Sequence, residues 1–323
     1  MLYLRLQNGR ILCTDLRSKL NRSIIPTRTF CNSRSKYEIS PFTRRLYKLP
    51  PVPTPSSQHH NLATFLSYAE QTSLPTTSTV YVGTRYEYTV LQSLRQYALA
   101  LHRVGGRDDA GIDLVGTWHL PERERERAVR VLVQCKALKT KLGPNLVREL
   151  EGALRQAPVG WRTAQTAGIL VSPREATKGV RDTLARSSYP LFWLMVEQDG
   201  TLKQALWNSR AEKLGLDPLG VETRYGVAQS DSGSITTQVT LTWDGCDIPD
   251  LDRVESDLAR SEQEWISSWG LEVSELGKDA LLDTVESIFP DGRPDIVADG
   301  KVAEQDREKV AQALRIIDTT QCK

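Results

Sequence analysis

The two stretches that decide the fold are residues 109–113, which read DAGID, and residues 131–136, which read VLVQCK. The second stretch belongs to residues 129–136, where Val129, Val131, Val133 and Cys135 occupy alternate positions, and this period of two predicts a strand. Gln134 and Lys136 therefore project from one face of it, roughly 6.6 Å apart along the strand. Asp113 stands among apolar residues that also predict a strand, where aspartate has a low propensity and needs a reason.

Both stretches carry groups suited to phosphodiester hydrolysis, which needs a metal ion, an activated water and a cation for the developing charge. Asp113 offers a hard anionic oxygen suited to Mg²⁺. The side-chain oxygen of Gln134 and the backbone carbonyl of Cys135 are further candidate ligands. Lys136 could lower the pKa of the attacking water and hold a phosphate oxygen. Glu87 could add the second negative charge that Gln134 lacks.

Glu87 has two interpretations. It precedes Val90 and Leu91 by three and four residues, so it falls on the apolar stripe of a predicted helix. A carboxylate facing inward must be paired, bound to metal or close to water. The alternative is a glutamate in the first helical turn that the helix dipole stabilises.

The remaining periodicity predicts helices that alternate with strands. Helices are expected over residues 61–70, 82–101, 145–157, 251–268 and 302–317, with one more starting at Ser172, and strands within 103–118 and over 129–136, 167–171, 189–196 and 235–243. This order predicts an α/β fold with a mixed sheet flanked by helices.

Five segments together resemble the Mrr-type restriction endonucleases, a branch of the PD-(D/E)XK nuclease fold. They read GTRYEYTVLQSL, GGRDDAGIDLVG, VLVQCKA, VRELEGAL and GILVSPREATKGVRDTLAR, within residues 80–196. The resemblance implies that Glu87 is the acid of the first helix, Asp113 the metal-binding aspartate and Gln134–Lys136 the Q-x-K motif. Ala110 departs from the family, which usually has Gly at that position.

The charge distribution divides the chain. Residues 1–50 hold 11 Lys/Arg against two acids, whereas residues 241–323 hold 20 acids against nine bases. The basic, Ser-containing head is typical of a mitochondrial presequence; the alternative is a basic arm that contacts nucleic acid. We expect a presequence over 1–45, a linker and lead-in helix over 46–79, the nuclease-like domain over 80–245 and an acidic, partly helical extension over 246–323.

Other features exclude some classes of protein. No run of eighteen apolar residues is present, so we expect no membrane span. The five cysteines form no C-x-x-C pair, which argues against a structural zinc. His59–His60 lies in a Pro- and Ser-rich stretch and is interpreted as a solvated linker. Nothing indicates a small-molecule cofactor.

With its import-like head, the whole chain is similar to fungal mitochondrial proteins required for respiratory growth. The first hypothesis is a Mg²⁺-dependent endonuclease acting on mitochondrial DNA in the matrix, as a homodimer if both strands are cut, with Arg107, Lys139 and Lys141 contacting DNA. The alternative is a catalytically inactive nucleic-acid-binding or assembly factor in the mitochondrion.

Overall fold

The computed structural model describes residues 38–54, 58–104, 111–121, 128–138, 140, 142–157, 160–227, 235–270, 277–290 and 302–321. The chain divides into two compact units. The sheet unit contains Val52–Arg123 and Val129–Pro249, and the helical unit contains the described residues of Ser35–Pro51 and Asp250–Lys323. Among the described helices, none is both long and apolar enough to cross a membrane.

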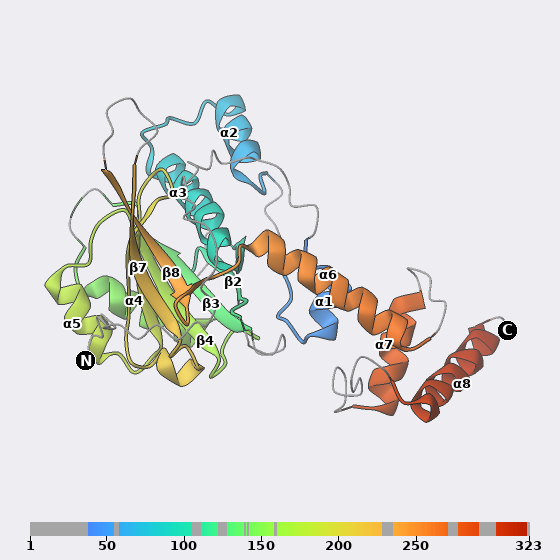
Figure 1. The fold of residues 1–323 in the computed structure, drawn as a ribbon. Coiled ribbons are helices and arrows are strands. Elements are labelled where there is room, and N and C mark those ends of the chain that lie inside the picture. The colour runs from blue at the N-terminus through green and yellow to red at the C-terminus, as the bar shows by residue number, and fades with distance from the viewer. Residues whose placement is uncertain are drawn as a thin grey trace. The chain divides into compact units, whose positions relative to one another are not determined.

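A six-stranded mixed sheet forms the centre of the sheet unit (Figure 1). Its strand order follows the chain. Along the sheet, the first strand is antiparallel to the second and the second to the third. The third, fourth and fifth strands are parallel, and the sixth is antiparallel to the fifth. The strands are β1 Leu99–Arg103, β2 Leu114–Trp118, β3 Val129–Cys135, β4 Thr166–Ser172, β5 Leu191–Val196 and β6 Leu202–Trp207. The prediction of a mixed α/β sheet is thereby confirmed.

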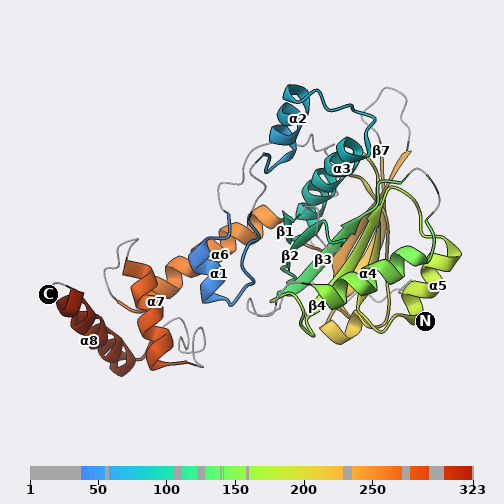
Figure 2. The same ribbon diagram turned by 180° about the vertical axis from the view of Figure 1, so that it is seen from behind.

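Helices flank this sheet on both sides (Figure 2). Helices α4 Asn145–Gln156 and α5 Lys178–Arg186 pack on the face that carries Leu132, Leu170 and Trp193, all fully buried. On the opposite side, α3 Thr79–Leu94 is tied to the sheet by the Tyr86 hydroxyl, which donates to the carbonyl of Val196 at 2.7 Å. The core therefore has helix, sheet and helix layers.

The helix predicted over 82–101 is wrong in its last part. After α3 the chain makes a short 3-10 turn, η1 Arg95–Tyr97, and Ala98 adopts a left-handed backbone with φ of 61°. Leu99 and Leu101 then belong to β1, paired with Trp118 and Gly116 of β2. Their apolar spacing suits a helix as well as a strand buried on both faces, and pairing with β2 decides between the two.

The helix predicted to start at Ser172 begins later. Ser172 ends β4, and its hydroxyl accepts a bond from the Arg174 amide at 3.1 Å. The residue that caps α5 is Thr177, whose hydroxyl accepts from the Val180 amide at 3.3 Å. The capping-box pattern was therefore misplaced because Ser172 is committed to strand pairing and a local turn.

The interpretation of His59 as solvated is also wrong. Its side chain is buried, and its Nδ1 lies 2.8 Å from the Tyr88 hydroxyl. Helix α2 Leu62–Gln71, close to the predicted 61–70, packs Phe65 against Tyr88 of α3 and against His59. His59, in the predicted linker before α2, is thus part of the folded sheet unit.

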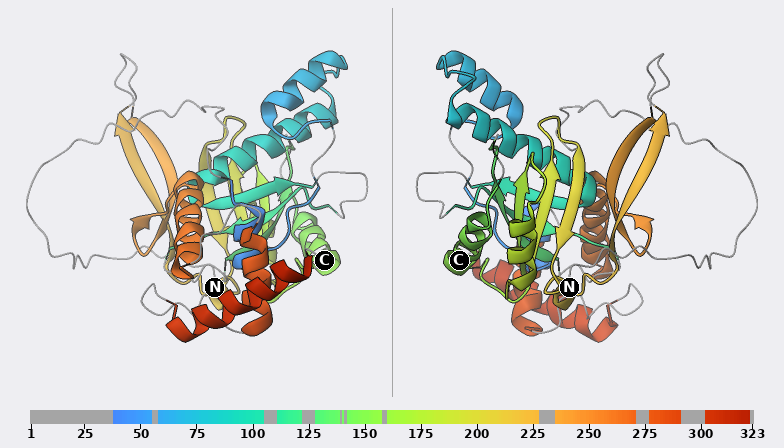
Figure 3. Two further views of the ribbon diagram at one scale, coloured as in Figure 1. Left: turned by 90° about the vertical axis from the view of Figure 1, so that its right-hand side faces the viewer. Right: turned by 90° about the vertical axis from the view of Figure 1, so that its left-hand side faces the viewer.

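A second, three-stranded antiparallel sheet completes this unit. It contains β7 Leu219–Val227, β8 Ile235–Trp243 and β9 Cys246–Asp247, in the order β7-β8-β9. Figure 3 shows β7 and β8 as a long strand pair. A 3-10 turn, η3 Glu212–Leu214, precedes β7. The strand predicted over 235–243 is confirmed as β8, whereas β7 was not predicted.

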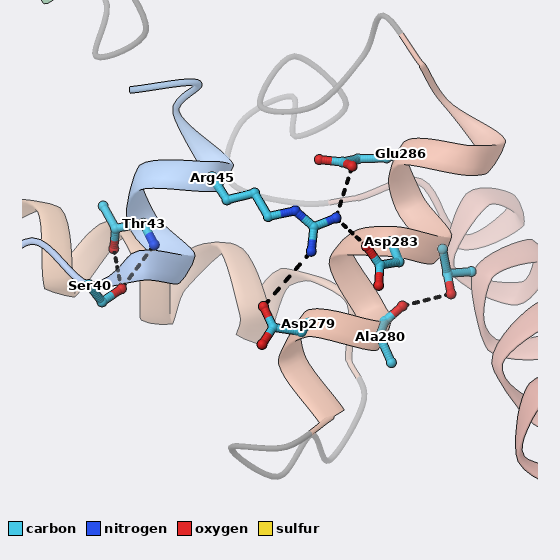
Figure 4. A network of polar contacts seen from close by, with 8 residues as sticks. Ser40, Thr43, Arg45, Asp279, Ala280, Asp283 and Glu286 are labelled. Carbon is cyan, nitrogen blue, oxygen red and sulfur yellow. Dashed lines mark hydrogen bonds and ion pairs between the residues drawn. The ribbon is translucent and has the colours of Figure 1, made fainter. Parts of the chain in front are cut away.

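The helical unit combines residues from both ends of the chain. Its helices are α1 Pro41–Leu46, α6 Leu251–Ser268, α7 Gly277–Ile288 and α8 Glu304–Gln321, which confirms the helices predicted near 251–268 and 302–317. Arg45 of α1 forms ion pairs with Asp279, Asp283 and Glu286 of α7 (Figure 4). Phe42 of α1 packs on Trp265 of α6, with ring centroids 5.9 Å apart.

The boundary predicted at residue 45 therefore falls inside a helix of the helical unit. Leu46, Tyr47 and Leu49, at the start of the predicted linker, are also buried. Residues 38–49 are folded because α1 supplies an apolar side chain and a guanidinium to helices from the far end of the chain. The presequence stays a prediction, and residues 1–37 lie outside the described part of the chain.

Candidate functional site

Asp113 lies directly before β2 and is held by the backbone of β3. Its amide donates to the carbonyl of Val133 at 3.0 Å, and its Oδ2 accepts from the amide of Cys135 at 2.6 Å. A carboxylate that accepts a short backbone hydrogen bond is fixed in orientation. This contact is the physical reason for an aspartate at the end of an otherwise apolar strand.

Gln134 is the most buried polar residue of the candidate site, with 3% of its surface exposed. Its Oε1 has no hydrogen-bond partner among the described residues. A buried amide oxygen without a partner costs about 1–3 kcal/mol, so such an atom in a native fold calls for an explanation.

The loop before Asp113 contains Gly111, at a position whose backbone conformation and surroundings favour glycine. Its φ is +80°, and a Cβ built there would lie 3.0 Å from Nε2 of Gln134. The left-handed backbone favours glycine, and any larger side chain would also crowd the carboxamide. The glycine of DAGID therefore leaves room for Gln134 beside Asp113.

Lys136 follows β3 and reaches toward helix α4. Its Nζ lies 3.2 Å from Oε2 of Glu149, and the Asn145 amide nitrogen donates to the other oxygen of Glu149 at 3.3 Å. The lysine side chain is 26% exposed. Sequence reasoning missed Glu149 as a partner, although its place one turn into the helix after the Q-x-K strand was a usable signal.

Glu87 forms an ion pair with Arg103, which is not among the predicted site residues. Nε of Arg103, the last residue of β1, donates to Oε2 of Glu87 at 2.5 Å, and the two side chains are only 17% and 12% exposed. The Arg103 guanidinium also lies 5.8 Å from the ring centroid of Tyr88. Glu87 is thus a paired, inward-facing carboxylate rather than a solvated residue of the first helical turn.

The charges of these residues meet at the end of β3. Burial raises the pKa of the Cys135 thiol, and the carboxylates of Asp113 and Glu87 raise it further. The cations of Arg103 and Lys136 act on the same thiol in the opposite direction. Glu87, Asp113 and Lys136 come from three elements, and the charges of all three act on the Cys135 thiol.

The structure does not describe all of the predicted site residues. Arg107, Lys139 and Lys141, the predicted DNA contacts, lie outside the described residues. Within the described part of the chain, no group of three or more His, Cys, Asp and Glu side chains is arranged to hold a metal ion. The predicted ligand set has two such side chains, Asp113 and Glu87, and depends on oxygens of Gln134 and Cys135 for the rest.

This donor set fits a hard divalent cation. All of its candidate atoms are oxygens, as Mg²⁺ prefers. The Gln134 oxygen is buried and adjoins the backbone that holds Asp113. A cation ligand is one explanation for a carboxamide oxygen that has no donor among the described residues.

Comparison with known proteins identifies the family. The model of the family described as Required for respiratory growth protein 7 matches residues 78–128 and 122–225. A protein of that name from Vanderwaltozyma polyspora is 30% identical over 214 residues, which covers 49% of this chain and 84% of that protein. This chain belongs to the Required for respiratory growth protein 7 family. The matched residues include the whole candidate site.

Two further relatives of this family member are mitochondrial by name. The Required for respiratory growth protein 7 of Saccharomyces cerevisiae is 28% identical over 171 residues, covering 41% of this chain and 71% of that protein. An uncharacterised mitochondrial protein of Schizosaccharomyces pombe is 36% identical over 159 residues, covering 48% of this chain and 62% of that protein, less than two thirds of its length. No solved structure matches the chain.

Proposed function

We propose that the sheet unit is a restriction-endonuclease-like domain that hydrolyses phosphodiester bonds of mitochondrial DNA with Mg²⁺, in the matrix, and thereby supports respiratory growth. The observation that carries this proposal is the buried oxygen of Gln134, which has no donor among the described residues and lies beside the backbone-held carboxylate of Asp113. The mitochondrial names of the relatives support the location, and their names also support the link to respiratory growth.

Each residue has a separate task in this proposal. Asp113, Gln134, the Cys135 carbonyl and Glu87 would hold the cation, which when bound supplies neutralisation of the phosphate and acidification of a water. Lys136 would leave Glu149 to hold a phosphate oxygen and stabilise the charge that develops there. Its partial exposure makes this exchange feasible, because an exposed ion pair contributes only about 0–1 kcal/mol.

A second function has its own supporting observation. Arg103 binds Glu87 and Glu149 binds Lys136, so two of the four predicted catalytic groups have a partner of opposite charge within the chain. If these pairs persist when nucleic acid binds, the domain is a non-catalytic nucleic-acid-binding or assembly factor. The two functions differ in whether the Glu87–Arg103 and Lys136–Glu149 ion pairs break when nucleic acid binds.

The test compares the full chain with variants on supercoiled and linear DNA, with Mg²⁺ or with EDTA. Asp113→Asn and Lys136→Met are expected to lower the cutting rate by at least about 10³-fold, as removal of a group that acts on transition-state charge does. The matched control is Lys203→Met, because Lys203 lies 3.6 Å from Glu197 in a similarly exposed pair. Its cutting rate should not change.

Other results decide against the nuclease. Cutting that survives in Asp113→Asn would contradict the assigned site. Absence of cutting, with DNA binding that weakens as salt is raised, would favour the non-catalytic function. Calorimetry with Mg²⁺ alone separates metal binding from catalysis, and Asp113→Asn should abolish the heat of binding.

A further inference from the structure

The outer edge of β7 is a long strand edge with few of the usual protections. Strand β7, Leu219–Val227, pairs with β8 and, among the described strands, with no other. It contains neither proline nor lysine, the residues that commonly prevent an edge strand from pairing with another chain. In this nine-residue strand, the residues whose backbone groups do not point to β8 are therefore available for pairing at the edge that no described strand covers.

The sequence of this strand is complementary to itself when reversed. It reads LGVETRYGV, and Thr223 stands at its centre. On either side of Thr223 stand Glu222 and Arg224, and beyond them Val221 and Tyr225. We propose that β7 pairs antiparallel with β7 of a second copy of this chain, about a two-fold axis at Thr223.

Exposure supports a partner on this strand. Tyr225 is 73% exposed and Val221 is 40% exposed, although both residue types favour strands and apolar contacts. In the proposed pair, Tyr225 of each copy lies opposite Val221 of the other. Directly opposed residues have Cβ atoms about 4.5–5.5 Å apart, so the tyrosine ring covers the valine.

Charge selects the register of the pair. With Thr223 opposite Thr223, each Glu222 lies opposite an Arg224 of the other copy. A shift of the register by two residues in one direction places Glu222 opposite Glu222, and a shift in the other direction places Arg224 opposite Arg224. Like charges in opposed positions are unfavourable, so only the register centred on Thr223 satisfies both.

The charged side chains are accessible for this exchange. Arg224 now contacts Glu222 of its own strand at 3.2 Å and also pairs with Asp247 of β9. The arginine and Glu222 side chains are 39% and 42% exposed. The interface is isologous, as a two-fold dimer requires, and its pairing mode is strand addition at a sheet edge.

Charge exchange tests the pairing by analytical ultracentrifugation of the full chain. Each single reversal, Glu222→Arg or Arg224→Glu, creates two like-charge contacts per dimer, and the dissociation constant should rise by about tenfold or more. The double variant restores opposite charges and should recover most of the affinity. Asp247→Asn, which removes a contact of Arg224 within the chain and creates no like-charge contact, should not raise the dissociation constant.

A disulfide tests the register itself. In a background with Cys13, Cys31, Cys246 and Cys322 replaced by Ser, Thr223→Cys should form a symmetric intermolecular disulfide under mild oxidation. Val221→Cys is the matched control, because its two copies would be offset by four residues, roughly 13 Å along the strands, and should not cross-link. A chain that stays monomeric, or a Thr223→Cys variant that cross-links no faster than Val221→Cys, would overturn the proposal. Neither measurement depends on nuclease activity.

Discussion

Gln134 in the sheet unit and Glu262 in the helical unit are both polar side chains shielded from solvent. Both carboxylate oxygens of Glu262 accept hydrogen bonds, whereas the side-chain oxygen of Gln134 accepts none from the described residues. Oε2 of Glu262 accepts from Ser40 at 2.6 Å and from Thr43, and its Oε1 accepts from Lys278 at 3.0 Å. Gln134 is 3% exposed and its oxygen has no partner among the described residues. Glu262 therefore joins segments of the helical unit, whereas the described part of the sheet unit supplies no donor to the Gln134 oxygen.

The same contrast appears in the origin of the partners. Glu262 draws donors from α1, so its bonds join segments more than 200 residues apart in the chain. Arg45, on the same short helix, contacts three carboxylates of α7 (Figure 4). In the sheet unit, Asp113 is bound by the neighbouring strand, and the oxygen of Gln134 has no donor among the described residues. The bonds to Glu262 account for its burial, whereas the buried oxygen of Gln134 calls for a partner such as a water or an ion.

Among the variants considered, Phe42→Ala should lower the stability of the helical unit most. Phe42 is 4% exposed, packs on Trp265 and lies below the Lys278 ammonium, 5.5 Å from the ring centroid. Truncation of a buried phenylalanine lowers the free energy of unfolding by about 3–5 kcal/mol. Hydrogen exchange should show lost protection in α6 and α7 and retained protection in β3 and β4. Leu66→Ala, at a 40% exposed leucine of the sheet unit, is the control and should change little.

Glu262→Gln should remove the acid sensitivity of the helical unit. Burial by itself would raise the pKa of Glu262, but hydrogen bonds from Ser40, Thr43 and Lys278 outweigh it and lower the pKa below its usual 4.5. A lowered pKa means stability that is present above pH 4.5 and is lost as pH falls through the folded-state pKa. The loss of charged hydrogen bonds in the variant should cost about 2 kcal/mol at pH 7.

Urea unfolding between pH 7 and pH 3 measures this effect. The difference in stability between the natural chain and Glu262→Gln should be largest at pH 7 and should shrink toward pH 3. A difference that does not vary with pH would show that folding does not shift the pKa of Glu262.

Replacing Gln134 by Leu should test the contrast between Gln134 and Glu262, because it removes a buried acceptor that has no donor among the described residues. We expect Gln134→Leu to raise the free energy of unfolding by about 1 kcal/mol while abolishing Mg²⁺ binding. The matched control is Gln204→Leu on β6, because Oε1 of Gln204 accepts from the Ala176 amide at 3.0 Å. That variant should lose about 1 kcal/mol.

Urea unfolding without added metal compares the two glutamine variants directly. If Gln134→Leu destabilises the chain as much as Gln204→Leu does, the Gln134 oxygen has a structural partner, and the strongest support for a ligand site disappears.

Arg45→Gln should have the smallest effect. The arginine side chain is 35% exposed, and Asp279 and Asp283 are 65% and 64% exposed, so water and salt screen the pairs. We expect a loss of about 0.5–1 kcal/mol at low salt and less at 0.5 M salt. A loss that is several times larger and independent of salt would mean that Arg45 orders α7 through packing rather than charge.

The sequence predicted best the elements whose pattern has one interpretation. Strand β3 alternates along its length, and α4 repeats its apolar residues at helical spacing, so both were found near their observed ends. Strand β1 was missed because its residues continue the apolar spacing of α3. Strand β7 was missed because Gly220, Glu222 and Arg224 weaken its pattern, and pairing with β8 determines it instead.

Among the candidate site residues, the sequence alone determined that Asp113, Gln134 and Lys136 would lie on adjoining strands, because side-chain direction in a strand has a period of two and neighbouring strands pair. It also determined the charge asymmetry between the two ends of the chain. Only the tertiary structure decided which charges are paired, such as Glu87 with Arg103 and Lys136 with Glu149, since these contacts join separate elements. It alone placed α1 with the C-terminal helices, because burial of Phe42 and the bonds to Glu262 depend on residues more than 200 positions away.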